Sequence, residues 1–478
     1  MTPDHRPSVV VVGSGLSGLA AADALARAGW AVTILGPADR VGGVVDTIHR
    51  DGWLIERSAD CFLASRPEVV PLAERLGISA ELVGVQPAAR RALVWHAGRL
   101  LPVPKGFRLL APGRTWPLLM SPILTVSGKC RVLGERFVAP GRAAAEADES
   151  LESFAVRRLG REAFEKLVQP LAAGIWTADP ARLSMLAACP DFLALEREAG
   201  SLWAGERARL RAQPAAAEAA GARYGQFLSF SSGMGRLPQR LADELARSGV
   251  RFVPMLATSV GRSTAGRWDV AVSGAAAPLS ADAVVVATPA DVSSRLLTGL
   301  DEQLGVELEA IEYAGSCIVS LGFARDRVSH SLDAAGLVIP RSAHRRILAV
   351  SFASSKFPGR APPGGVLLRV FVGGALDPDV MRLADAEMVD LAVSEVRLLL
   401  GAQGDPQLTH VERWQGAMPQ YHVGHGSRVA RIDAAVGRHP GLALAGAAYT
   451  GVGIPQVIAS GQAAATRITG RSPGDPAG

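Results

Sequence analysis

The sequence predicts an α/β protein built around a parallel sheet. Residues 9–12 are four valines that run into glycines spaced G-x-G-x-x-G, which is typical of a strand buried on both faces and ended by a tight turn. Residues 250–260 predict one further strand, and residues 281–289 repeat the buried strand and turn. Residues 441–465 then give a strand, a glycine turn and a helix of small residues. The chain of 478 residues is too long for one ordinary core, so several domains are expected.

The first glycine turn indicates a dinucleotide site. After it, residues 19–29 are rich in helix formers and end at a glycine, and residues 30–35 predict a second strand. This order of strand, turn, helix and strand is the context that the dinucleotide fingerprint requires. Its first glycine permits the tight turn, the second lets the backbone approach a pyrophosphate, and the third lets the helix pack on the strand. The contacts expected here are Gly13, Ser14, Gly15, Gly18 and Leu19.

The residue that ends the second strand departs from this fingerprint. An Asp or Glu is expected there to accept hydrogen bonds from the ribose hydroxyls. This chain has Gly36 instead, followed by Pro37, Ala38 and Asp39. Either Asp39 reaches the ribose from the loop or the contact is lost. Losing one charge-assisted hydrogen bond costs about 1.5–3 kcal/mol, which a large cofactor tolerates.

A second glycine pair and the C-terminal segment favour a flavin over a nicotinamide. The pair Gly42 and Gly43 either closes more backbone on the same cofactor or forms an ordinary turn. A nucleotide domain completed by a C-terminal strand and helix is the arrangement of two-domain flavoproteins, in which the closing helix favours negative charge on the reduced flavin. FAD is the expected cofactor. The further contacts expected are Asp39, Arg40, Gly42, Gly43, Val260, Gly446, Val452, Gly453 and Ile454.

The composition argues against several other classes of protein. The four cysteines form no C-x-x-C pair, so neither a disulfide scaffold nor a metal site is expected. Such cysteine usage is typical of a protein in a reducing compartment. The formal net charge of +5 is spread without basic blocks between aromatics, so no nucleic-acid partner is expected. No window of about 18 apolar residues lacks charge, so no transmembrane helix is predicted. Residues 115–128 come nearest to one and predict a buried or interfacial helix pair.

Nearly the whole chain resembles the oxygen-dependent porphyrinogen oxidases, within the flavin amine oxidase superfamily. The G-x-G-x-x-G turn and RVGG are shared with the wider superfamily. The combination of AAGIW-x-x-DP, MPQYHVGH and GVGIP is specific to the porphyrinogen branch. The remaining motifs are IERSADCFLASRPE, RRALVWHAGRLLPVP and FVGG.

The resemblance implies roles for several residues toward a tetrapyrrole. Arg91 matches the arginine that binds a propionate, and a guanidinium is the natural fork for a carboxylate. Gly174 matches the glycine whose backbone lies against the substrate edge near the flavin. Phe371 and Val338 match residues that sandwich the macrocycle, and Asp60 falls where the family has Asn or Asp close to flavin and substrate.

Two stretches depart from the family pattern. An apolar clamp residue of the family falls on Ser351, whose hydroxyl reduces apolar contact with a flat ring. Ser58 and Ala59 stand where Gly and Pro set the turn before Asp60.

The implied reaction is the FAD-dependent, oxygen-dependent six-electron oxidation of a porphyrinogen to a porphyrin in haem biosynthesis. A flavin takes two electrons at a time, so three cycles follow, each giving hydrogen peroxide. No general base stands at a motif position, so no catalytic residue is assigned. Arg66, placed where the coproporphyrinogen branch carries a basic residue, favours coproporphyrinogen III, and protoporphyrinogen IX is the alternative.

Two remoter functions stay open. One is another flavin oxidase, acting on amines or polyenes, although amine oxidases place a lysine near the flavin and build an aromatic cage, and both residue types are scarce here. The other is a non-catalytic tetrapyrrole-binding protein, which the departures at Gly36, Ser351 and Ser58 leave open.

Three regions are expected. Residues 1–87, 205–290 and 425–478 form a discontinuous Rossmann-like FAD-binding domain of the amine oxidase-like type. Residues 88–110 and 291–424 form a mixed-sheet substrate domain, and residues 111–204 form a helical excursion that in relatives rests on a membrane surface. The expected partners are a tetrapyrrole and oxygen. The protein is expected in the cytoplasm. Peripheral contact with the inner face of the membrane is left open, and so is the choice between a monomer and a homodimer.

Overall fold

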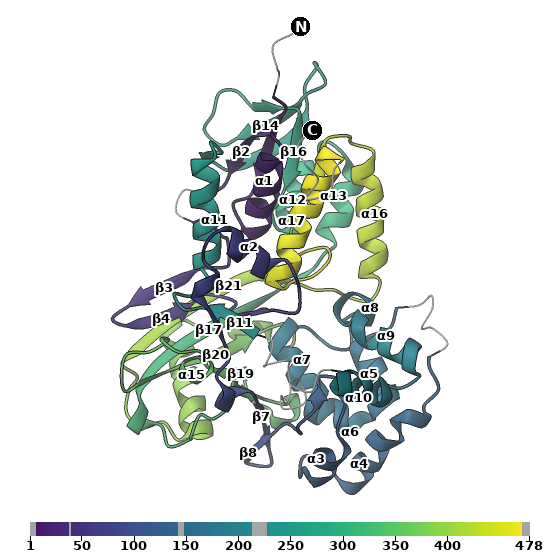
Figure 1. The fold of residues 1–478 in the computed structure, drawn as a ribbon, viewed down its shortest axis with the longest axis vertical. Helices are drawn as coiled ribbons and strands as arrows, with labels where there is room; N and C mark the ends of the chain where they lie inside the picture. Colours follow the sequence, from purple (N-terminus) through teal and green to yellow (C-terminus); the bar gives the residue numbers. More distant parts are fainter. Residues whose placement is uncertain (1–5, 38–39, 142–147, 213–226, 471–478) are drawn as a thin grey trace.

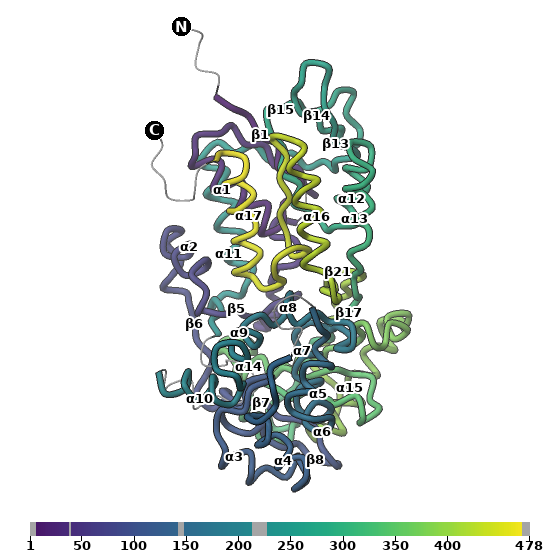
Figure 2. The backbone as a smooth tube through the Cα atoms, turned by 90° about the vertical axis from the view of Figure 1, so that its right-hand side faces the viewer, coloured from purple at the N-terminus to yellow at the C-terminus, as the bar shows by residue number. Residues whose placement is uncertain are grey.

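The computed structural model describes residues 6–37, 40–141, 148–212 and 227–470. A parallel sheet with its covering helices forms one end of the molecule, and a mixed sheet and a group of short helices lie at the other end (Figure 1). The turned view separates the same parts along the long axis (Figure 2). The parallel sheet draws strands from the beginning, the middle and the end of the sequence, so its domain is discontinuous.

The parallel sheet has the predicted α/β arrangement. The four valines of β1 pair in parallel with β2 on one side and with β16 on the other, which accounts for their burial. The predicted C-terminal strand adds to the far side of β16. In spatial order the strands are β12 (Arg251–Val253), β2 (Ala31–Leu35), β1 (Ser8–Val12), β16 (Ala283–Val286) and β22 (Leu442–Leu444).

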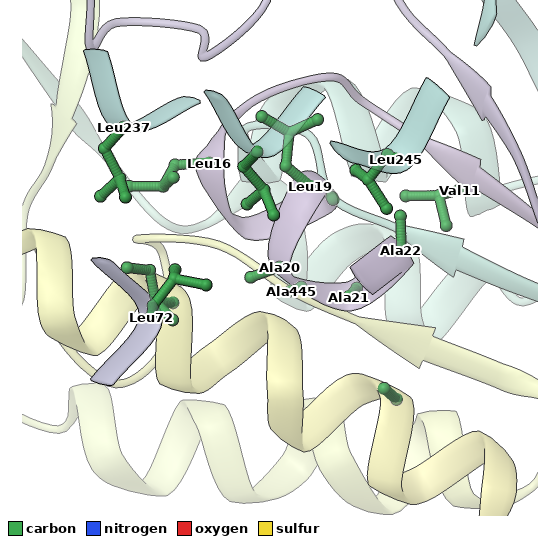
Figure 3. Packing of buried hydrophobic residues seen from close by; sticks show 14 of the residues in the cluster. Val11, Leu16, Leu19, Ala20, Ala21, Ala22, Leu72, Leu237, Leu245 and Ala445 are labelled. Atoms are coloured by element: carbon green, nitrogen blue, oxygen red, sulfur yellow. The ribbon is translucent and has the colours of Figure 1, made fainter. Parts of the chain in front are cut away.

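Helices cover both faces of this sheet. Alternate residues of β1 point to opposite faces, so Val9 and Val11 pack in one apolar cluster while Val10 and Val12 pack in another. Figure 3 shows the first cluster, where Leu19 packs against neighbouring helices. The helices of that face are α1 (Leu16–Arg27), α11 (Arg236–Arg247) and α17 (Ile454–Thr469), and those of the other face are α12 (Ala290–Leu297), α13 (Glu302–Glu309) and α16 (His425–Gly437).

The single strand predicted over residues 250–260 is wrong, because the structure divides it in two. Its first part is β12 of the parallel sheet, and its second part, β13 (Ala257–Arg262), joins a separate antiparallel sheet. Pro254 lies between them and has no N–H to donate to a strand ladder, so pairing stops there. The other strands of that sheet are β14 (Trp268–Val272) and β15 (Leu279–Ala281).

The second sheet is mixed, as predicted, with seven strands. Only β7 and β18 pair in parallel among its ladders in the described part of the chain. Helix α15 (Asp385–Leu400) covers one face, and the helical region covers the other. The order is β21 (Leu408–Pro419), β17 (Tyr313–Ala324), β20 (Gly365–Gly373), β19 (Ile347–Phe352), β18 (Gly336–Val338), β7 (Ala92–His96) and β8 (Arg99–Pro102).

The helical region is made of short helices. Its last helix, α10, packs on α9, and the boundary expected at residue 204 falls within α10. We therefore propose the predicted three-region division with α10 assigned to the helical region. The helices are α3 (Thr115–Met120), α4 (Val126–Leu133), α5 (Leu151–Leu159), α6 (Arg161–Ala163), α7 (Gln169–Trp176), α8 (Met185–Ala188), α9 (Pro190–Ala199) and α10 (Leu202–Ala212).

Shorter elements join these parts. None of the helices in the described ranges has the length and apolar character needed to cross a bilayer. The remaining strands and α-helices are β3 (Thr47–Arg50), β4 (Trp53–Glu56), β5 (Phe62–Leu63), α2 (Val69–Arg75), β6 (Leu82–Gly84), β9 (Phe107–Arg108), β10 (Ala111–Pro112), β11 (Phe227–Phe230) and α14 (Ala353–Lys356).

Candidate active site

The first glycine turn requires bare backbone at two of its positions. Gly13 has a φ of +117°, and a Cβ there would lie 2.5 Å from the carbonyl oxygen of Ala287. A Cβ on Gly18 would lie 2.0 Å from the carbonyl oxygen of Gly13, so the helix packs directly on the turn. Gly15 caps α1 without any side-chain hydrogen bond to the first turn. The helix N-terminus therefore keeps free N–H groups for an anion.

The second glycine pair lies on the first turn. The backbone N–H of Gly42 donates to the carbonyl of Ser14 over 2.9 Å, and Gly42 forms a parallel bridge with Gly15. A Cβ on Gly43 would lie 3.3 Å from the Cα of Gly15. The N–H of Val45 also donates to the carbonyl of Gly42 over 3.2 Å, so the pair forms a turn, and its contact with the cofactor stays a prediction. Arg40 stacks over the ring of Trp414, 5.7 Å from its centroid, and Asp39 lies outside the described residues.

The C-terminal turn brings a second uncapped helix to the site. Helix α17 begins after Gly453, whose backbone is extended, with no side-chain cap. Gly461 lets α17 lie against α1, because a Cβ there would be 2.2 Å from the carbonyl oxygen of Ser17. The N–H of Gly446, at a φ of +141°, donates to the Ser460 hydroxyl over 3.0 Å.

These turns fit an extended dinucleotide. Two adjacent helices begin without a side-chain cap in the described part of the chain, and several glycines leave room that any side chain would fill. The predicted contacts Leu19 and Val260 have fully buried side chains in apolar clusters, which leaves their backbone atoms as the possible contacts. Val452, by contrast, is only partly buried beside the turn.

Tyr421 holds the C-terminal turn, a role that the sequence did not predict. Its hydroxyl donates to the carbonyl of Ala447 over 2.5 Å and accepts from the N–H of Gly451 over 2.8 Å. Burial raises the pKa of the Tyr421 phenol, so the group stays protonated and keeps donating. The ring also stacks on His425 at 4.2 Å between centroids. The MPQYHVGH motif singles out the segment that contains this tyrosine, but the motif does not indicate which residues the tyrosine contacts.

The structure brings together three of the predicted substrate residues. A Cβ on Gly174 in α7 would lie 3.8 Å from Val338 Cγ1 in β18. Phe371 lies two strands from β18, opposite Ala349 on the central strand β19. Phe371 and Val338 both belong to the apolar cluster between the sheet and the helical region.

Hydrogen bonds at both ends hold α7 on the sheet. At its start the Gln169 side-chain oxygen accepts from the N–H of Arg341 over 2.9 Å. At its end the Thr177 carbonyl accepts from the N–H of Ala375 over 2.8 Å. Val452 from the C-terminal turn packs against the same apolar cluster as Phe371. The expected cofactor turn and the expected substrate surface therefore adjoin.

Asp60 is the centre of a buried charge network. Lys356 Nζ lies 2.9 Å from each carboxylate oxygen, and Arg369 Nη1 lies 3.3 Å from one of them. Burial alone would raise the pKa of the Asp60 carboxyl, but the Lys356 and Arg369 cations outweigh it and hold that pKa well below its usual range. Asp60 is therefore a fixed anion whose oxygens are already engaged, which suits it poorly as a proton acceptor.

The two departures from the family pattern have different surroundings. The Ser58 hydroxyl donates to the carbonyl of Val44, so it ties the altered turn to the segment after the second glycine pair. The Ser351 hydroxyl oxygen is buried and has no hydrogen-bond partner in the described part of the chain. Ser351 lies opposite Arg369 in the sheet, two residues along from the pair of Ala349 and Phe371.

The two arginines predicted to bind carboxylates differ in their contacts. Arg91 donates from Nε to the carbonyl of Asp333 over 2.8 Å and from Nη2 to its carboxylate. Arg91 lies just before β7, and its ion pair with Asp333 is partly exposed. Arg66 is exposed, and among the described residues its side chain makes no ion pair. Both roles stay predictions.

Comparison with known proteins identifies the family. The sequence pattern of the flavin containing amine oxidoreductases matches residues 16–469. The coproporphyrinogen III oxidase of Bacillus subtilis is 31% identical over 471 residues, covering 96% of this chain and 97% of that protein. The coproporphyrinogen III oxidase of Propionibacterium freudenreichii subsp. freudenreichii is 33% identical, covering 96% and 90%. A crystal structure from Exiguobacterium sp. 255-15, provisionally assigned as a protoporphyrinogen oxidase, superposes with a TM-score of 0.84 at 30% identity, covering 97% and 98%.

The chain belongs to the flavin-containing amine oxidoreductase family. It is an FAD-dependent oxidoreductase, and the glycine turns and uncapped helices described above fit that cofactor. The predicted family, fold class and cofactor are confirmed.

Proposed function

We propose that this protein oxidises a porphyrinogen to a porphyrin in haem biosynthesis, with oxygen as the electron acceptor and hydrogen peroxide as the by-product. The proposal rests on one observation: the C-terminal turn lies beside an apolar surface. Val452 of that turn packs on the same apolar cluster as Phe371 and Val338. Gly174 lies against Val338. A porphyrinogen is a large, largely apolar macrocycle, so such a surface suits it. The names of the relatives agree with this substrate class.

The residues of this chain bind and orient the substrate. Val338 and Phe371 offer apolar atoms from the sheet, and Gly174 lets the backbone of α7 come close because it has no side chain. The bound FAD supplies the two-electron oxidation, which is repeated three times to remove six electrons. Asp60, fixed by Lys356, shapes the charge of the site without taking a proton. The proton lost from a pyrrole nitrogen is released to water.

Coproporphyrinogen III is the proposed substrate, and protoporphyrinogen IX is the alternative. The first carries four propionates and the second two, so the first gains more from basic side chains near the site. Arg91 and the exposed Arg66 are the proposed propionate ligands. For Arg91 to bind a propionate, the substrate carboxylate must replace Asp333 in its ion pair, which is exposed enough for exchange.

The test is a comparison of the two porphyrinogens with the purified holoenzyme in air, following porphyrin fluorescence. The proposal expects a higher kcat/KM for coproporphyrinogen III, and a KM for that substrate raised about tenfold in Arg91→Ala, which removes a charge-assisted contact. A higher kcat/KM for protoporphyrinogen IX would favour the alternative. Turnover of amines or polyenes, or no turnover by a flavin-loaded protein, would reject both.

We further propose that the helical region rests on the anionic surface of a membrane, with the enzyme itself in the cytoplasm. The helix pair of residues 115–133 and the turn after it expose large apolar side chains near the exposed Arg136. The chain binds such a surface by burying these side chains while the basic groups face the lipid head groups. The exposed residues are Trp116, Met120, Val126 and Phe137.

Sedimentation with vesicles of anionic and of neutral lipid tests this contact. The wild type is expected to sediment with anionic vesicles, and a variant carrying Trp116→Ser and Phe137→Ser is expected to remain in solution with its activity unchanged. Equal sedimentation of both proteins would contradict the proposal. Light scattering of the same samples without lipid separates a monomer from a homodimer.

A further inference from the structure

Gly36, which replaces the expected acid, faces the side chain of Ser14. Its φ does not lie in the left-handed region, so the backbone at this position does not itself require glycine. The restriction is steric. A Cβ at position 36 would lie 2.3 Å from Ser14 Oγ and 2.6 Å from Ser14 Cβ, both too close for any side chain to be accepted. The next nearest atom, the Ser14 backbone nitrogen, is 3.2 Å away, which a small adjustment relieves.

Ser14 is held in this position on two sides. It is 5% exposed, and its hydroxyl donates to the carbonyl of Arg40 over 3.2 Å. Its own carbonyl accepts from the N–H of Gly42. The serine thus links the first glycine turn to the loop that carries the second glycine pair, and its side chain fills the space beside the end of β2.

We infer that Ser14 and Gly36 are an exchange pair: the serine side chain occupies the position from which an acid at position 36 reaches the cofactor ribose. This chain therefore holds the adenosine ribose of FAD without a carboxylate from β2. In the dinucleotide fingerprint that carboxylate accepts from the ribose 2′-hydroxyl. The inference rests on FAD binding alone and is independent of the porphyrinogen substrate.

The exchange pair makes a prediction that neither residue makes alone. Gly36→Glu in the natural chain drives a Cβ into Ser14 and disturbs the turn. With Ser14→Gly present, the two closest contacts of a Cβ at position 36 are removed and the backbone nitrogen of residue 14 lies 3.2 Å away, so the glutamate is expected to reach the ribose. The effect of Gly36→Glu on FAD affinity therefore reverses sign with the residue at position 14.

The experiment is a titration of the FAD-free proteins with FAD, followed by the quenching of flavin fluorescence. Gly36→Glu is expected to weaken binding at least about tenfold. The Ser14→Gly/Gly36→Glu double variant is expected to bind FAD about tenfold more tightly than Ser14→Gly, the gain from one charge-assisted hydrogen bond. An FAD analogue without the 2′-hydroxyl of the adenosine ribose is expected to bind like FAD to the wild type, and about tenfold less tightly than FAD to the double variant.

Further variants separate steric effects from charge and from the neighbouring acid. Gly36→Ala is expected to weaken binding in the natural chain, yet Ser14→Gly/Gly36→Ala is expected to match Ser14→Gly. Asp39→Asn is expected to keep the wild-type affinity. Circular dichroism of each FAD-free protein checks that it is folded, and Gly36→Ala provides the milder test where Gly36→Glu does not fold.

Two results would overturn the inference. In one, the substitutions at position 36 change FAD affinity by the same factor whether residue 14 is serine or glycine, which shows that the serine side chain does not exclude a side chain at position 36. The other is a wild type that discriminates against the 2′-deoxy analogue and loses this discrimination in Asp39→Asn, which makes Asp39 the ribose ligand. If the protein gives the expected FAD titrations but does not oxidise a porphyrinogen, the result contradicts the proposed substrate and leaves the exchange pair supported.

Discussion

Asp60 shows at the residue scale how this site keeps a charge inside the protein. The carboxylate is about one-tenth exposed, and Lys356 and Arg369 surround it. Removing one partner of a buried ion pair leaves an uncompensated charge, which costs more than the pair itself contributes. The arrangement therefore depends on both cations being present.

We predict that Lys356→Met lowers the free energy of unfolding by about 3–5 kcal/mol, measured by denaturant titration. Adding Asp60→Asn to the same chain is expected to restore little of the loss, because the buried Arg369 then loses its carboxylate partner. The control is Arg382→Met, since Arg382 and Asp379 form a highly exposed pair that contributes about 0–1 kcal/mol. A loss in Lys356→Met no larger than in this control would contradict the prediction.

Ser351 presents the opposite situation, a buried polar atom without a partner among the described residues. An unsatisfied buried hydroxyl costs about 1–3 kcal/mol. We predict that Ser351→Ala raises the free energy of unfolding by about 1 kcal/mol. The matched control is Ser354→Ala, because the Ser354 hydroxyl accepts from the N–H of Leu367 over 3.0 Å and its loss should destabilise. Equal destabilisation by both substitutions would show that Ser351 has a partner.

At the scale of elements, the site depends on how the C-terminal turn is held between a strand and a helix. The turn follows β22 and leads into α17, and Tyr421, from the segment between β21 and α16, bonds to it at two points. One tyrosine thus connects the segment after β21 to the C-terminal turn. Its removal should loosen the cofactor more than it loosens the fold.

We predict that Tyr421→Phe raises the rate of FAD dissociation about tenfold, measured by the appearance of free flavin fluorescence on dilution. Two hydrogen bonds of about 0.5–1.5 kcal/mol each are lost. The control is Tyr313→Phe, because the Tyr313 hydroxyl accepts from the N–H of Ala290 over 2.7 Å and not from the C-terminal turn. The control should lose a similar amount of stability without releasing FAD faster, and an equal release from both variants would contradict the role of Tyr421.

At the scale of the whole molecule, buried and half-buried histidines set how stability depends on pH. Burial is the largest cause that lowers the pKa of four of them below the usual 6.5, so they stay neutral in the fold and take up protons when it opens. Because the unfolded chain then binds more protons, stability falls as the pH drops below about 6.5. The four are His96, His330, His422 and His425.

We predict that the melting temperature falls between pH 7.5 and pH 5.5, measured by differential scanning calorimetry in one buffer series. Glu56 acts in the opposite direction, since burial raises its pKa above 4.5, but it is one group against four. The control is His425→Gln, which removes one titrating group and should reduce the pH dependence. A melting temperature that stays constant or rises over this range would contradict the prediction.

The sequence predicted the parts of the fold that local patterns determine. Runs of valine gave the buried strands β1 and β16, and glycine spacing gave the first turn. The split between β12 and β13 was missed although Pro254 signalled it. Contacts between residues far apart in the sequence could not be predicted. Lys356 and Asp60 are 296 residues apart, and no local pattern in either segment indicates that they pair.

The candidate site shows the same division. The glycines could be assigned because their role follows from having no side chain. The meaning of Gly36 could not, because it depends on the side chain of Ser14 filling the neighbouring space. Likewise the role of Arg91 came from the family alone, and the ion pair with Asp333 became visible only in the fold.

We propose that this FAD enzyme oxidises a porphyrinogen by passing electrons to oxygen. The most direct test mixes the purified flavoprotein with coproporphyrinogen III in air and measures porphyrin and hydrogen peroxide in the same sample. We expect the substrate to bleach the flavin absorption when oxygen is absent. In air we expect three molecules of peroxide for each porphyrin formed. A flavin that stays oxidised with either porphyrinogen would contradict it.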